Sequence, residues 1–178
     1  MMVRLGMLRI IVVLLFVAAT ISVAFAVDSE LTRQTMKGFP GVYVVVEEMQ
    51  SNIEKHTKKF GLTKLQLQAD TERRLVENGV RVLSKDEWLK TPGKPVLYVG
   101  VNTHETERYW YAYDIKVEIQ QIVYMEANPK IQALATTWCI NMTGLTNIGK
   151  LDIIRSDTGV LIGKFVEAFK GTNDGKGK

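Results

Sequence analysis

The stretch YAYDIKVEIQQIVYM, residues 111–125, alternates apolar and polar side chains and decides the fold class. Successive side chains of an extended chain point to opposite faces, so residues two apart share a face. The apolar face of this stretch is formed by Ile115, Val117, Ile119, Val123 and Met125. The pattern predicts one long strand with a buried face and a face in water.

Four further strands are predicted around this stretch. Residues 96–103 alternate in the same way, and residues 131–141 do so after a turn predicted at residues 127–130. Short links between these three strands predict an antiparallel meander. Upstream, the β-branched run at residues 42–46 and the apolar run at residues 80–83 predict two more strands.

Two long helices complete the predicted fold. Residues 63–78 begin with Thr63 and Gln66 at the spacing of a capping box, and Gly79 follows as a terminator. Near the end of the chain, apolar residues recur every three or four positions from Leu151 to Phe169. A short helix is predicted after Ser84. The order of elements predicts an α+β fold: a mixed five-stranded sheet with both long helices on one face.

The first 26 residues have the composition of a secretory signal peptide. Arg4 and Arg9 precede an apolar run, and Ala24-Phe25-Ala26 supplies the small-residue pattern for cleavage before Val27. The alternative is an uncleaved anchor, because residues 10–27 carry no charge over a length close to that of a membrane span. We therefore expect a signal peptide at residues 1–26, a linker at 27–41, one domain at 42–170 and a disordered tail at 171–178.

Composition excludes several classes of function. The net charge is +4, and no segment shows the dense lysine and arginine clusters of nucleic-acid-binding proteins. Cys139 is the single cysteine, so no intramolecular disulfide can form. Cys139 is either a buried apolar residue or paired between chains. The two histidines, His56 and His104, lie far from it in sequence.

Residues 144–150 match the phosphate-loop pattern G-x-x-x-x-G-K, but Leu151 stands where a magnesium-binding Ser or Thr is required. A glycine-rich loop between a strand and the last helix explains the same residues. The acidic residues around His104 are too few for a tight metal site. We therefore predict that the protein is not an enzyme and has no catalytic, cofactor-binding or metal-binding residues.

An aromatic cluster at residues 109–113 is the strongest indication of a binding surface. Tyrosine, tryptophan and arginine are favoured at protein interfaces because they bury large areas. The alternative is that Tyr111 and Tyr113 are alternate core residues of a strand. Ile122 and Tyr124 add apolar side chains to the face predicted to be in water. The predicted partner-binding residues are Arg108, Tyr109, Trp110, Tyr111, Tyr113, Ile122 and Tyr124.

Three runs of the chain resemble a group of uncharacterised exported bacterial proteins. FPGVYVVVE (residues 39–47) is similar to their G-V-x-V-x-V-E strand, GLTKLQLQADTERR (61–74) to their G-L-T-x-x-Q-L-Q helix, and VLSKDEW (82–88) to their E-W turn. The element order is also similar to the small α+β domains of periplasmic accessory proteins, such as the amino-terminal domain of TolB. The resemblance implies export and carries no functional residue.

These observations predict a non-catalytic periplasmic accessory or protein-binding domain, periplasmic or secreted after signal-peptide cleavage. Its expected partner is another periplasmic or envelope protein, or a second copy. We expect no nucleic acid partner, and membrane contact only through an uncleaved leader. The alternative is a carrier of a small ligand or lipid, with an apolar pocket of roughly 300 Å³ or more between helices and sheet.

Overall fold

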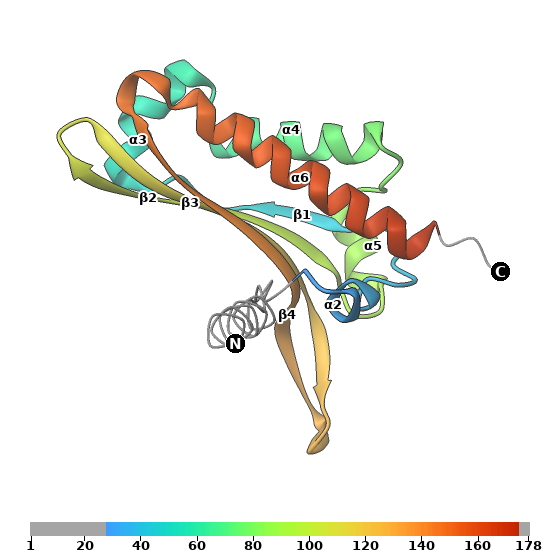
Figure 1. Cartoon of the computed structure of the whole chain (residues 1–178). Helices are drawn as coiled ribbons and strands as arrows, with labels where there is room; N and C mark the ends of the chain where they lie inside the picture. Colours follow the sequence, from blue (N-terminus) through green and yellow to red (C-terminus); the bar gives the residue numbers. More distant parts are fainter. Residues whose placement is uncertain (1–27, 175–178) are drawn as a thin grey trace, which may run out of the picture.

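A four-stranded mixed sheet forms the body of the protein (Figure 1). Short helices precede and follow β1 along the chain, and a long helix ends the described residues. The computed structural model describes residues 28–174; the predicted signal peptide and residues 175–178 lie outside the described residues. The strands, in spatial and sequence order, are β1 (Tyr43–Val46), β2 (Val96–Glu107), β3 (Trp110–Met125) and β4 (Asn128–Asn147). The helices are α2 (Glu30–Gln34), α3 (Ser51–Thr57), α4 (Lys64–Glu77), α5 (Lys85–Lys90) and α6 (Asp152–Asn173), with 3-10 turns η1 (Lys58–Phe60) and η2 (Ile148–Lys150).

The α+β class and the mixed sheet are confirmed, but the sheet has four strands rather than five. β1 pairs parallel with β2, and β2, β3 and β4 form the predicted antiparallel meander. Residues 80–83, predicted as the fifth strand, make one parallel bridge, between Val82 and Val42. Pairing ends there because Ser84 starts a complete capping box with Glu87 and the chain turns into α5.

Both long helices pack on one face of the sheet, α4 over β1 and α6 over β3 and β4 (Figure 1). Thr63 caps α4 by accepting a hydrogen bond from the Gln66 amide. The Gln66 side chain donates to Asp70, one turn further along α4, so the reciprocal bond of the predicted capping box is absent from α4.

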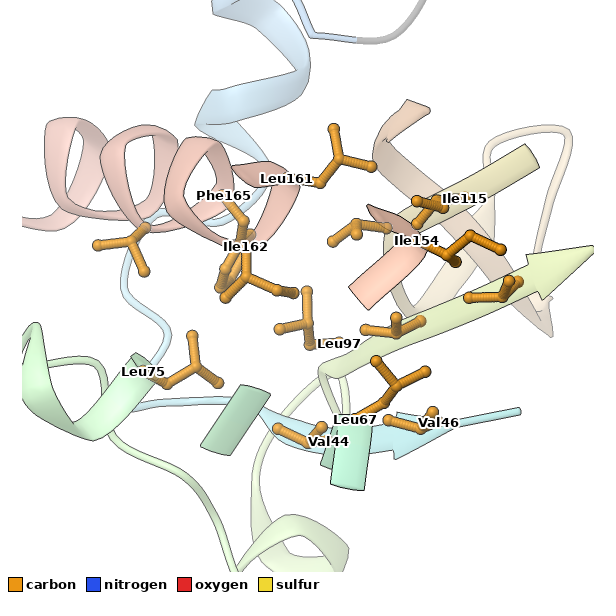
Figure 2. Close-up of a cluster of buried hydrophobic side chains, with 14 of the residues drawn as sticks. Val44, Val46, Leu67, Leu75, Leu97, Ile115, Ile154, Leu161, Ile162 and Phe165 are labelled. Carbon is orange, nitrogen blue, oxygen red and sulfur yellow. The ribbon is translucent and has the colours of Figure 1, made fainter. Parts of the chain in front are cut away.

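The core lies between these helices and the sheet. Figure 2 shows side chains of β1, β2, β3, α4 and α6 pointing toward one another. Burying each large aliphatic or aromatic side chain stabilises the fold by about 1.5–3 kcal/mol. Across the core, the fully covered side chains include Ile53, Leu62, Leu67, Leu75, Leu97, Val99, Ile115, Val117, Ile119, Trp138, Ile154 and Phe165.

The two helices differ in how clearly their sequences show the buried face. The apolar face of α6, including Leu161 and Phe165, is buried as its spacing predicts. In α4 the buried positions are Leu67, Thr71 and Leu75, whereas Leu65 is 80% exposed. Because α4 has only a few apolar residues, the face that packs against the sheet and α6 includes the polar residue Thr71.

The segment predicted as a linker is part of the folded body from residue 28 onward. Ser29 and Thr32 form a capping box that begins α2, and Met36 is completely buried. The Asn173 side chain donates to the Met36 carbonyl and accepts from the Gly38 amide. α6 therefore continues through Gly171 to Asn173, beyond its predicted end, and holds the amino-terminal segment in place.

β4 is longer than predicted at both ends. The turn from β3 occupies residues 126–127, and the strand includes the predicted turn residues 128–130. It also extends through Gly144, which pairs with Tyr113 of β3. The phosphate-loop pattern at residues 144–150 therefore lies on a paired strand and on η2, and it is not a loop at the start of a helix.

Gly144 is required because the ring of Tyr113 lies directly over it. A Cβ atom at residue 144 would overlap the ring and hydroxyl of Tyr113. The ring cannot move away easily, since Tyr113 is 6% exposed and its hydroxyl donates to Asp157 Oδ2 at 2.6 Å. This contact joins β3, β4 and α6.

Gly144→Ala should lower the free energy of unfolding by about 1–3 kcal/mol, the usual cost of adding atoms to a packed site. Gly149→Ala is the matched control, because a Cβ atom there meets only Asn147 Oδ1 at 3.4 Å. Urea unfolding of both variants measures the difference. Equal loss of stability in the two variants would contradict the proposed packing of Tyr113.

Asp28 connects α2 to β4 through a buried tryptophan. Its Oδ1 accepts from Trp138 Nε1 and from Arg33 Nε, each at 2.7 Å, and its Oδ2 accepts from Arg33 Nη2 at 2.7 Å. The hydrogen bond from Arg33, with a smaller effect of Trp138, lowers the pKa of the Asp28 carboxyl below its usual value. Ionised Asp28 is therefore favoured by folding.

Asp28→Ala should lower the free energy of unfolding by about 1–3 kcal/mol at neutral pH, because Trp138 Nε1 loses its acceptor. A carboxyl with a lowered folded-state pKa stabilises fully above its unfolded pKa and loses this effect as pH falls through the folded value. The difference between wild type and variant should therefore shrink in acid, as measured by urea unfolding over a pH series. Asp28→Asn keeps an acceptor for Trp138 and should lower the free energy of unfolding less than Asp28→Ala does. If the difference in stability between wild type and Asp28→Ala grew as the pH fell, the expected direction of the pH dependence would be wrong.

Candidate interaction surface

The two ends of β3 carry the two candidate binding surfaces. At one end, the aromatic turn (residues 106–110) joins β2 to β3. At the other, the β3–β4 arm (residues 121–136) extends away from the layer formed by α4 and α6 (Figure 1). The seven predicted partner-binding residues are divided between these two surfaces and the core.

The aromatic turn holds three of the predicted residues in an exposed position. Tyr109 has a φ of 71°, a left-handed conformation that is uncommon for a residue with a side chain. Its amide donates to Glu105 Oε1 at 3.2 Å and its carbonyl accepts from the Ile148 amide at 2.8 Å. The Arg108 guanidinium lies 5.0 Å from the centre of the Tyr109 ring. Tyr109 and Trp110 are 47% and 43% exposed.

Tyr111 and Tyr113 belong to the core and are not available to a partner. They are 1% and 6% exposed, on the face of β3 that α6 covers. Burial, with the hydrogen bond to Asp157 as a second cause, raises the pKa of Tyr113 to about 12. The structure thus corrects the prediction for these two residues: the strand alternation places them beside Ile115 and Val117, on the buried face.

Ile122 and Tyr124 lie on the β3–β4 arm, far along β3 from the aromatic turn. Ile122 pairs with Leu134, and Tyr124 pairs with Gln132, whose side chain donates to the Tyr124 hydroxyl. Ile122 is half-buried, whereas Tyr124 and Leu134 are 66% and 58% exposed. These three apolar side chains share one face of the arm.

The opposite face of the arm is also apolar, which the sequence did not predict. Val123 and Met125 were predicted to point into the core, but Val123 is half-buried and Met125 is exposed, together with Ile131. Alternation alone gives no indication of this exposure, since the same pattern continues whether or not a helix covers the strand. The signal lies in length: β3 and β4 are longer than the helices above them can cover.

Hydrogen bonds fix the base of the arm to the body. The Ile122 amide donates to the Gly93 carbonyl at 2.7 Å. The Gln121 side chain donates both to the Thr35 carbonyl and to Thr137 Oγ1. A shift in the pairing between Ile119 and Gln120 marks the point where the arm leaves the body. The arm is therefore anchored at its base and exposed beyond it.

The face of the sheet opposite α4 and α6 is largely polar. Tyr43 stacks on Trp88 of α5 with ring centres 5.2 Å apart, so α5 covers this face near β1. Farther along, Glu118 lies opposite Cys139. Cys139 is half-buried, and burial raises the pKa of its thiol.

Open grooves lie on the surface of the body. One of about 390 Å³ runs between α4 and α6, where Arg155 Nε donates to Asp70 Oδ2 at 2.6 Å and lowers the pKa of the Asp70 carboxyl. Another of about 500 Å³ lies beside Met49, Thr57 and Leu65. Both are lined by charged and apolar residues together and open to solvent.

Within residues 28–174, none of the helices has both the length and the apolar composition to cross a bilayer. Nor do three or more His, Cys, Asp or Glu side chains of these residues gather as metal ligands would.

Comparison with protein-family models gives no match, and comparison with curated proteins gives none either. The resemblance to exported bacterial proteins and to the amino-terminal domain of TolB stays a prediction.

Proposed function

We propose that this protein is a non-catalytic accessory domain of the bacterial envelope that binds another envelope protein. In this proposal, residues 1–26 direct export and are removed, and the domain works in the periplasm or outside the cell. The leader has the charged start, apolar run and small-residue ending that signal peptidase requires. The partner-binding surface is the β3–β4 arm, with the aromatic turn as a second contact.

The exposed apolar side chains of the arm carry this proposal. A two-stranded ribbon is marginally stable in water by itself, and most soluble proteins keep exposed apolar patches small. This ribbon presents large apolar side chains on both faces: Tyr124 and Leu134 on one, Met125 and Ile131 on the other. A partner that encloses the arm would bury both faces at once.

The aromatic turn supports a second contact of the same kind. Tyr109 and Trp110 are about half exposed. The Tyr109 backbone is held by its bonds to the Glu105 side chain and the Ile148 amide, and the Trp110 carbonyl accepts from Thr106 Oγ1. A turn whose backbone is already fixed needs less ordering on binding. Tyrosine, tryptophan and arginine are also the residue types that contribute most to interface energies.

The interior gives the carrier alternative less support. The space between the helices and the sheet is occupied by the buried side chains of the core, including Leu97, Ile115 and Phe165 (Figure 2). The two grooves described above open to solvent, and Leu67 and Ile162 of the core line part of the groove between α4 and α6. A lipid or other apolar ligand would have to displace core side chains in order to enter.

Site-specific photo-crosslinking in the native host tests the proposal. A photoreactive phenylalanine analogue replaces Tyr124 or Leu134 in turn, and Leu65, which is 80% exposed on α4, serves as the control position. We expect the two arm positions to give the same heavier product and the control position to give none. Products of equal yield from all three positions, or none from the arm, would refute binding through the arm.

Substitutions then measure the contribution of each surface. Tyr124→Ser with Leu134→Ser should weaken binding of the crosslinked partner about 30-fold or more, as expected when interface residues worth 2 kcal/mol or more are lost. Trp110→Ala should weaken it if the aromatic turn takes part. Titration of the purified partner into each variant gives the dissociation constants, and circular dichroism checks that the variants are folded. Recovery of a bound lipid or metabolite in place of a partner would favour the carrier.

A further inference from the structure

We propose that the outer edge of β4, at residues 139–147, pairs antiparallel with the same segment of a second copy of this chain. The two sheets would then join into one continuous sheet with all long helices on the same face. This surface is the outer edge of β4; it is separate from the arm, and the aromatic turn lies on the other side of β4, where Trp110 pairs with Asn147. The inference goes beyond the proposed function and does not depend on it.

The two edges of the sheet are treated differently by the fold. β1, at one edge, has four residues, and its Val44 carbonyl accepts a hydrogen bond from the Gln68 side chain. Just before β1, the Val42 amide and carbonyl are bonded to Arg81 and Leu83. At the other edge, β4 has twenty residues, and no strand within residues 28–174 pairs with its outer side.

The charge pattern of β4 is unusual for an edge strand. Natural proteins place charged side chains, lysine above all, on edge strands, and these charges prevent pairing with another chain. No Asp, Glu, Lys, Arg or His occurs from Ile131 to Gly149. β3, its neighbour, carries Asp114, Lys116 and Glu118 over a comparable stretch. The edge strand of this sheet thus lacks the usual protection.

The lack of charge favours a second copy over an unrelated strand. When a strand pairs antiparallel with its own copy, residues near the two-fold axis lie opposite themselves, and like charges there would repel. An unrelated partner strand imposes no such requirement and could be attracted by charge. A long uncharged segment is therefore what self-pairing requires.

The core is also incompletely covered at this edge. Ile140 and Met142 pack against the core but remain partly exposed. On the opposite face of β4, Thr143 is exposed and Leu145 is 58% exposed. A second β4 strand alongside would cover apolar side chains on both faces while satisfying the free backbone groups of the edge.

Mass measurement and cysteine crosslinking test the pairing. Sedimentation equilibrium of the purified protein over a hundredfold range of concentration should show a monomer–dimer equilibrium.

Single cysteines at residues 141, 143 and 145 in the Cys139→Ala background, together with wild-type Cys139, sample one face of the segment. The position closest to the two-fold axis should form a disulfide-linked dimer under mild oxidation. Leu65→Cys in the same background, exposed but on α4, should not.

A charge placed on the edge should separate the copies. Thr143→Lys is expected to weaken dimer formation at least tenfold and to leave the far-ultraviolet circular dichroism unchanged. Leu65→Lys adds the same charge on α4 and should leave the dimer unaffected, as should Tyr124→Ser with Leu134→Ser on the arm. A monomer at all concentrations, a dimer insensitive to Thr143→Lys, or pairing of this edge with another protein only would overturn the inference.

Discussion

The burial of alternate β3 side chains beneath α6 is the constraint on which the rest of the structure depends. Ile115, Val117 and Ile119 are fully covered because β3 lies inside the sheet, between β2 and β4, and beneath a helix. This face fixes the register of β3 with both neighbours, since a shift of one residue would turn charged side chains inward. It also decides which tyrosines enter the core and which remain at the aromatic turn.

Much of this arrangement could be predicted from sequence because its signals are strong and local. The period of two in β3 and the apolar spacing of α6 specified both elements and their buried faces. Prediction was poorer where tertiary contacts decide the outcome. Residues 80–83 have strand composition, but the cap at Ser84 stops their pairing. Residues 28–41 have no apolar pattern, and they are ordered by contacts with Trp138 and Asn173, more than a hundred residues away.

The candidate surface shows the same division. The aromatic turn was predicted from its composition. For Tyr111 and Tyr113, the position in the strand alternation, and not the residue type, determined that they are buried. The apolar arm was recognised only in part, through Ile122 and Tyr124. Exposure of Met125 and Ile131 depends on where α6 ends relative to β3, and no local pattern records how far a helix reaches over a sheet.

The contact between Asn173 and residues 36–38 joins the two ends of the described chain. Asn173 is the last residue of α6, and its partners lie 135 and 137 positions earlier. Contacts of such long separation form late, since a large loop must close before they contribute. The amino-terminal segment therefore cannot be completed before α6 has formed. Residues 36–38 should thus be among the last of the described residues to become protected from proteolysis during folding.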